Sequence, residues 1–264
     1  MNALVQLFVG GEPVDKWCYD FLSLPEHAVQ SSAAVIVSAL ALWTLRPRIS
    51  LPPFRSSRLD SVVALLFIAI ELAIIAQRSY QNTLITLANL CHITTFGCIY
   101  CLLSNTVAAR WVYVLFCLPH AMSPLPALLF PDRNGWNLPF YGELFFFMHG
   151  SLLVLPWYMI STRAAPLVKF MTSMGFRTFL RWIACGTAFA FILWFGVLAP
   201  LALTSTSNLF YMLCAPGNLR TALAFLGKGW SLIGHVALAV IGAVYSSLLC
   251  YVVAPLVVIN SGRP

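Results

Sequence analysis

Charged residues are scarce in this sequence. Only 9% of the 264 residues are Asp, Glu, Lys or Arg, whereas 60% are hydrophobic, and the mean hydropathy is +0.86. Soluble domains usually carry about 25% charged residues, because their surfaces face water. The scarcity of charge therefore excludes an ordinary soluble protein and predicts a membrane protein with several spanning helices.

Several other signals are absent. The start, "MNALVQLFVGGEPVDKWC", has no basic segment and no long apolar core, so we do not interpret it as a cleaved signal peptide. The sequence shows no internal repeat, no Asn-x-Ser/Thr sequon and no motif for nucleic acids, metals, nucleotides or acyl-CoA. We therefore expect a single transmembrane domain over residues 1–264, without a cofactor, a metal site or a nucleic-acid partner.

Apolar runs predict about seven membrane crossings. A helix needs about 20 mostly apolar residues to cross the hydrocarbon core. Such runs, bounded by charged clusters, occupy residues 28–45, 60–77, 83–103, 111–130, 144–161, 180–204 and 231–259. The sequence thus predicts an all-α, polytopic helix bundle, and it leaves the oligomeric state open.

The distribution of basic residues predicts the orientation of the bundle. Cytoplasmic loops collect Lys and Arg. With the N-terminus outside or in the lumen and the C-terminus in the cytoplasm, the inside segments hold Arg46, Arg48, Arg55, Arg58, Arg110, Arg163, Lys169, Arg177, Arg181 and Arg263. The outside segments then hold only Lys16, Arg78, Arg133, Arg220 and Lys228. The net charge of +7 would then lie mainly at the cytoplasmic face, next to anionic lipid headgroups. We expect the protein to be located in an endomembrane such as the endoplasmic reticulum.

The eight cysteines divide into two groups. Six fall within the predicted helices, where a buried free thiol usually acts as a small hydrophobe: Cys91, Cys98, Cys101, Cys117, Cys185 and Cys250. Cys18 and Cys214 fall in segments assigned outside, where an oxidising lumen would allow a disulfide. The sequence leaves their bonded and free states open. The C-x-x-C spacing of Cys98 and Cys101 has no partner ligands and indicates core packing rather than a metal site.

Five titratable side chains lie at membrane depth, where each costs several kcal/mol unless it is paired or faces a cavity. They are Glu71, His92, His120, His149 and His235. A rise of ~1.5 Å per residue places them in the outward half of their helices, which predicts a shared polar cavity. The structural alternatives are an interhelical hydrogen bond for His235 and an anchoring role for Glu71. Prolines around His120, in "CLPHAMSPLP", favour a site role for it, because broken backbone is tolerated beside a cavity.

The stretch "TLANLCHITTFGCIYC", residues 86–101, places the Cys91 thiol next to His92. A buried thiol becomes a nucleophile only when a base takes its proton. Neighbouring side chains on a helix do not face each other, so this base has to come from another helix. His149, in "LFFFMHGS", is the first candidate and His120 the second. His92 is then expected to hold a substrate headgroup or carbonyl, or to donate to Glu71.

Longer motifs resemble those of a known family. "NLCHITTFGCIYCLL", "LPHAMSPLPALLFPDRNGWNLPFYGELFFFMHG" and "SNLFYMLCAPG" are similar, in this order, to the transmembrane protein 164 family. The resemblance runs from about residue 60 onward and includes "GGEPVDKWC" at residues 10–18, whereas the first predicted helix carries no motif. One difference is Asn89-Leu90, where the family tends to have Asn-Pro, so a proline kink beside the thiol is not expected.

The resemblance implies a membrane acyltransferase. This enzyme would move a polyunsaturated, typically arachidonoyl, chain from phosphatidylcholine to a lyso ether phosphatidylethanolamine through a thioester on Cys91. Phospholipid and lysophospholipid would then be its partners, and His92, Glu71 and Asn208 its candidate substrate-binding residues.

Two other classes of protein share part of this pattern. A proton-coupled transporter or channel would also place Glu and His in a membrane cavity, but it has no need of a thiol. A seven-helix receptor would fit the predicted orientation, yet the cytoplasmic helix ends carry no receptor motif.

Overall fold

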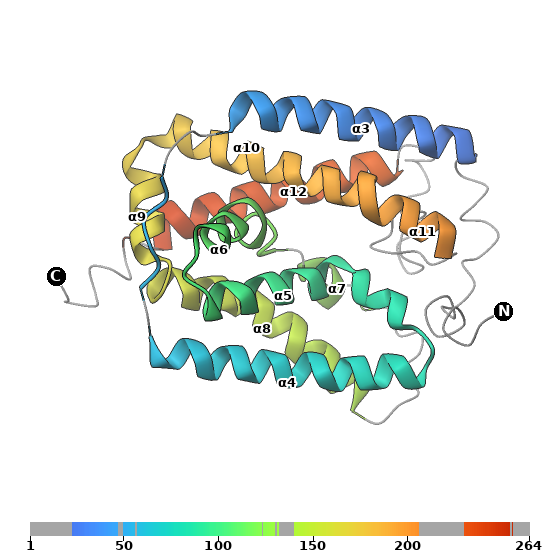
Figure 1. Ribbon diagram of the computed structural model, residues 1–264, viewed down its shortest axis with the longest axis horizontal. Helices are drawn as coiled ribbons and strands as arrows, with labels where there is room; N and C mark the ends of the chain where they lie inside the picture. Colours follow the sequence, from blue (N-terminus) through green and yellow to red (C-terminus); the bar gives the residue numbers. More distant parts are fainter. Residues whose placement is uncertain are drawn as a thin grey trace.

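The computed structural model describes residues 23–46, 50–55, 57–122, 124–129, 131, 140–205, 230–253 and 255. All regular secondary structure in these residues is helical (Figure 1), which confirms the predicted all-α class. Five segments are long and apolar enough to cross a membrane: Pro25–Leu45, Arg58–Tyr80, Tyr141–Ser161, Phe176–Leu203 and Leu232–Val252. They fit a multi-pass membrane protein, while the exact number of crossings and the orientation stay predictions.

The long segments are built from the following helices. They are α3 (Leu24–Leu45), α4 (Arg58–Tyr80), α8 (Tyr141–Ser161), α10 (Phe176–Leu193) with its extensions η3 (Trp194–Leu198) and α11 (Ala199–Ser205), and α12 (Trp230–Leu248) with η6 (Leu249–Val253). The shorter helices are η1 (Leu84–Ala88), α5 (Leu90–Leu103), α6 (Val107–Val112), η2 (Tyr113–Cys117), α7 (Leu125–Leu129) and α9 (Ala165–Ser173).

Two predicted crossings, 83–103 and 111–130, are not single long helices. The first begins as a 3₁₀ helix, η1, and continues as the 14-residue α5 after Asn89 takes an extended conformation, with φ −62° and ψ 146°. In the second crossing, helix η2 ends at Cys117, shortly before Pro119. Proline has no N–H to donate, and its ring obstructs the preceding helical turn. Each piece is therefore shorter than the roughly 20 residues of a full crossing.

Local signals explain where the first two long helices begin. Ser23 caps α3 and Ser57 caps α4, and in each case the acidic residue three positions later returns a hydrogen bond to the cap. These residues, Glu26 and Asp60, complete capping boxes that satisfy the first free N–H groups of the helix. The helices thus start slightly before the apolar runs predicted from residues 28 and 60.

The helices form two groups in Figure 1. Helices α4, α5 and α8 lie in the lower half of the view, and α3, α10 and α12 lie in the upper half. Helix α4 packs against α5 and α8, while α10 packs against α3 and α12. Large apolar side chains such as Val37 and Trp43 of α3 are 66% and 67% exposed, a surface suited to lipid rather than water.

The break at Pro119 is held by α10 and α12. Ser246 of α12 donates a hydrogen bond of 2.8 Å to the carbonyl oxygen of Leu118, as expected where a broken helix frees carbonyls at membrane depth. A Cβ atom on Gly186 would lie 2.6 Å from the ring of Pro119, and one on Gly242 would collide with the Pro119 carbonyl oxygen. Both glycines therefore permit the close approach of their helices to the break.

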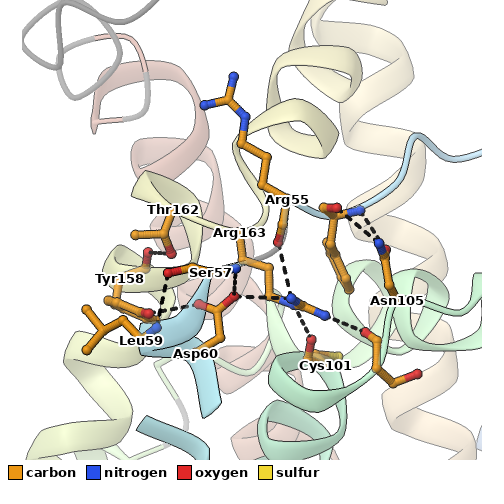
Figure 2. Close-up of polar contacts among 11 residues, drawn as sticks. Arg55, Ser57, Leu59, Asp60, Cys101, Asn105, Tyr158, Thr162 and Arg163 are labelled. Carbon is orange, nitrogen blue, oxygen red and sulfur yellow. Dashed lines mark hydrogen bonds and ion pairs between the residues drawn. The ribbon is translucent and has the colours of Figure 1, made fainter. Parts of the chain in front are cut away.

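A buried ion pair lies at the end of the bundle where α4 begins and α8 ends (Figure 2). Arg163 and Asp60 are only 4% and 1% exposed, and Nη1 of the guanidinium lies 3.1 Å from Oδ2 of the carboxylate. The hydroxyl of Tyr158 donates to Oδ1 of Asp60 over 2.8 Å. Because each charge has several partners, the desolvation of the pair is offset.

The same guanidinium also binds two further segments of chain. It donates to the backbone carbonyl oxygens of Cys101 at 2.6 Å, Ser104 at 2.8 Å and Arg55 at 3.1 Å. These bonds connect the start of α4, the end of α5 and the turn after α8, as Figure 2 shows. From the sequence alone, Arg163 was interpreted only as a basic loop residue, and its structural role was missed.

Candidate functional site

The first pair of predicted site residues that the structure brings together is His92 and Glu71. Nδ1 of His92 lies 3.0 Å from Oε2 and 3.3 Å from Oε1 of Glu71. Both residues are buried, at 4% and 1% exposure. A carboxylate only accepts hydrogen bonds, so with Glu71 ionised Nδ1 carries the proton. The Nε2 atom of His92 then keeps a lone pair for another partner.

Cys91 occupies the first turn of α5. The extended Asn89 ends η1, and α5 starts at the next residue, so the helix is interrupted beside the thiol even though no proline is present. The backbone N–H groups of His92 and Ile93 donate to the carbonyl oxygen of Asn89 at 3.1 and 3.2 Å, which closes the first turn of α5 around Cys91. The dipole of a helix favours negative charge at its N-terminus, where Cys91 lies. Cys91 is a free cysteine, and this partly exposed residue packs against the apolar core.

His149 is held in one tautomer by its own helix. Its Nδ1 atom lies 2.8 Å from the carbonyl oxygen of Phe145. The centre of the imidazole ring lies 4.1 Å from that of the Phe145 ring, with the two rings tilted by 37°. Because a carbonyl only accepts, Nδ1 must be the donor and Nε2 must be the acceptor. An imidazole with a free Nε2 lone pair, fixed in orientation, has the form required of a general base.

Arg78, which the sequence analysis did not select, links these groups. Its guanidinium interacts electrostatically with both Cys91 and His149, and His149 interacts in the same way with His92. The guanidinium also lies 5.0 Å from the ring centre of Tyr141, the first residue of α8. The signal that pointed to Arg78 was its position: it is one of only five basic residues predicted outside, and it closes an apolar helix.

The family comparison covers this whole arrangement. A model of the TMEM164 family matches residues 21–247. The chain belongs to the TMEM164 family. The match includes α3, where we found no motif, and it begins after the "GGEPVDKWC" segment. No solved structure matches the chain.

The second candidate base of this TMEM164 family protein lies in different surroundings. Nδ1 of His120 donates to the carbonyl oxygen of Phe116 at 2.7 Å, and its ring makes an edge contact with Trp194 at 5.6 Å. His235 also contacts this indole, with its ring centre 4.9 Å from that of Trp194. The structure therefore places His120 and His235 against the indole of Trp194. His149 instead lies within electrostatic range of His92 and Arg78.

Of the remaining cysteines, some are buried, and two lie outside the residues that the structure describes. Cys98, Cys101 and Cys117 are buried with free thiols, and the Cys101 thiol donates to the carbonyl oxygen of Ala109 at 3.2 Å. Within the described part of the chain, no group of three or more His, Cys, Asp or Glu side chains is placed to hold a metal ion. Cys18, Cys214 and Asn208 lie outside the described residues, so the disulfide and the role of Asn208 stay predictions.

Proposed function

We propose that this TMEM164 family protein is a cysteine-dependent acyltransferase that exchanges acyl chains between phospholipids. The donor is phosphatidylcholine with a polyunsaturated, arachidonoyl-type chain at the sn-2 position, and the acceptor is a lyso ether phosphatidylethanolamine. The observation that carries the proposal is the imidazole of His149, which is held at Nδ1 by Phe145 and shares the electrostatic influence of Arg78 with the free, partly exposed Cys91. A thiol, a base and a positive charge together are what nucleophilic catalysis on an ester requires.

The surroundings of the two candidate bases support His149 rather than His120. The electrostatic contacts of His149 are with Arg78 and His92, the neighbours of the thiol. His120 instead packs between Phe116 and Trp194. In the first step, Nε2 of His149 accepts the proton of the Cys91 thiol. The thiolate forms in the first turn of α5, where the helix dipole favours negative charge.

The first half-reaction forms the acyl-enzyme. The thiolate attacks the carbonyl carbon of the sn-2 ester, a carbon–sulfur bond forms, and the carbon–oxygen bond to glycerol breaks. The protonated His149 returns its proton to the departing oxygen, so that a lysophospholipid leaves with a free hydroxyl. The acyl chain remains on Cys91 as a thioester.

The second half-reaction reverses these steps with another lipid. The sn-2 hydroxyl of the lyso ether lipid gives its proton to Nε2 of His149 and attacks the thioester carbonyl. The carbon–oxygen bond forms, the carbon–sulfur bond breaks, and the thiol is restored when the proton returns to it. Donor and acceptor exchange one acyl group and one proton, so the cycle consumes no cofactor.

The His92–Glu71 pair supports the substrate side of this mechanism. Because Glu71 holds Nδ1 of His92, Nε2 is oriented toward another group, such as an ester carbonyl or a headgroup. When both nitrogens are protonated, Nε2 becomes a hydrogen-bond donor to the carbonyl oxygen on which negative charge develops. The apolar surroundings of the pair would limit hydrolysis of the thioester by water.

The test is the detection of the acyl-enzyme. Purified full-length protein is incubated with phosphatidylcholine that carries a labelled sn-2 polyunsaturated chain, and Cys91 is analysed by mass spectrometry for a hydroxylamine-labile adduct. The expected result is an adduct in the wild type that is absent in His149→Ala and Cys91→Ser. Cys185→Ala serves as the matched thiol control, because Cys185 is buried in α10, outside this group.

The result that overturns the proposal is equally specific. If Cys91→Ser still transfers the label to a lyso ether phosphatidylethanolamine at the wild-type rate, Cys91 is not the nucleophile. If the folded wild type gives neither adduct nor transfer with this donor and acceptor, the assigned reaction is wrong.

A further inference from the structure

The Arg78 side chain is a cation without an acidic partner among the residues that the structure describes. Among the described residues, the two ion pairs are His92–Glu71 and Arg163–Asp60, and Arg78 belongs to neither. Its Nε atom is buried and has no hydrogen-bond partner in the described part of the chain. A buried guanidinium donor that stays unpaired costs free energy, so the structure holds Arg78 ready for a ligand that brings an anion.

The environment of Arg78 fixes the direction of its guanidinium. The group lies 5.0 Å from the centre of the Tyr141 ring, and a cation above an aromatic face is attracted by the ring. A guanidinium presents its N–H donors in one plane, in a fork that matches two oxygens of a phosphate or carboxylate. Tyr141 therefore orients the planar N–H donors of the Arg78 guanidinium. A Lys ammonium, which is a point charge, would not provide such a pair of donors.

The depth of Arg78 selects between these anions. Arg78 lies in the last turn of α4, and Glu71 lies seven residues earlier, about 10 Å farther along the helix axis. The headgroup region of a bilayer leaflet is roughly 5–8 Å thick outside the hydrocarbon core. If Arg78 binds the phosphate of a phospholipid, the ester of that lipid lies at about the level of Glu71 and His92. If Arg78 instead bound the carboxylate of a free fatty acid, the reacting carboxyl group would stay at the level of Arg78, too far from these residues.

We propose that Arg78, supported by the Tyr141 ring, binds the phosphodiester of a phospholipid and so places the sn-2 position of that lipid against Cys91 and His149. The choice of ligand rests on the proposed function. Because donor and acceptor both carry a phosphodiester, the same residue serves both half-reactions. Headgroup discrimination between choline and ethanolamine then falls to other residues, and Arg78 selects phospholipids over neutral glycerides.

The experiment measures binding without turnover. Full-length Cys91→Ser protein in detergent is titrated with radiolabelled lysophosphatidylcholine, and in parallel with a monoacylglycerol of the same chain. Adding Arg78→Gln should weaken lysophosphatidylcholine binding about tenfold or more, since charge-assisted bonds to the phosphate are lost. Monoacylglycerol binding should change less than about twofold, because that lipid offers no phosphate.

The matched control is Arg177→Gln. Arg177 is exposed in the first turns of α10, and its removal should leave both affinities unchanged. An equal loss for both lipids in Arg78→Gln would show a merely structural role and overturn the inference, as would unchanged lysophosphatidylcholine binding. Competition by inorganic phosphate as strong as that by lysophosphatidylcholine would assign the site to free phosphate and overturn the lipid assignment.

Folding and function can be separated from binding. Should Arg78→Gln fail to fold by circular dichroism, Arg78→Lys decides the question, since it keeps the charge and loses the fork. A selective loss of about threefold or more for lysophosphatidylcholine then supports the inference, and unchanged binding of both lipids overturns it. If acyl transfer is absent while Arg78-dependent binding is intact, the proposed function fails and this inference stands.

Discussion

His92 and Glu71 form a buried pair, with Nδ1 of the imidazole 3.0 Å from Oε2 of the carboxylate. The two residues come from neighbouring helices, α5 and α4, and lie 21 positions apart in the chain. Because Cys91 precedes His92, the same pair that fixes the imidazole also fixes the first turn of α5 and the thiol that it carries.

The carboxylate of Glu71 should be needed for its charge. Glu71→Gln keeps the shape of the side chain but replaces a charge-assisted hydrogen bond by a neutral one, which is about half as strong. We expect kcat/KM for acyl transfer to fall about tenfold, for a loss of roughly 1.4 kcal/mol. The measurement is the steady-state transfer of a labelled chain, with Glu143→Gln, an exposed carboxylate of α8, as the control. A wild-type rate in Glu71→Gln would mean that the charge has no part in the reaction.

The two candidate bases should differ sharply on substitution. His149→Ala removes the imidazole that has Nε2 as an acceptor and lies within electrostatic range of Arg78. We expect the rate of acyl transfer to fall by about 10²–10⁴-fold, the usual contribution of a general base. His120→Ala should have a much smaller effect, because its ring packs on Phe116 and Trp194. The ranking comes from initial rates of both purified variants. The opposite ranking would transfer the role of base to His120.

The Arg163–Asp60 pair should control stability rather than chemistry. Removing one partner of a buried ion pair leaves an uncompensated charge and typically costs about 3–5 kcal/mol. Arg163→Met should therefore lower the free energy of unfolding by about that amount, with the exposed Arg177→Met near zero. Thermal unfolding in detergent, followed by circular dichroism, measures the change. A stable Arg163→Met protein would show that the carbonyl and carboxylate partners in Figure 2 contribute little.

Gly242 should not tolerate a side chain. A Cβ atom there would collide with the carbonyl oxygen of Pro119, so Gly242→Ala must push α12 away from the break and from the Ser246 hydrogen bond. We expect a loss of about 1–3 kcal/mol of stability, the usual cost of overpacking. Gly150→Ala is the contrast: no atom lies near its Cβ position, and Ala is a better helix former by about 1 kcal/mol. Equal stability of the two variants would contradict this account of the α12 contact.

The sequence by itself determined the class of the protein and most of the helices. Apolar runs between charged clusters located the five long segments, because a helix in lipid must be apolar along its whole length. The same reasoning was wrong about continuity in two places. It treated residues 83–103 and 111–130 as single helices, since hydropathy records neither the extended conformation of Asn89 nor the interruption at Pro119.

The candidate site shows the same division. Rare polar residues at membrane depth identified Glu71, Cys91, His92 and His149, because burying each of them requires a partner or a cavity. Which of them meet depends on contacts across helices, and these have no local signal. Only the tertiary structure joined Glu71 to His92, separated His120 from that group, placed Arg78 over Tyr141 and buried Arg163 against Asp60, 103 positions away.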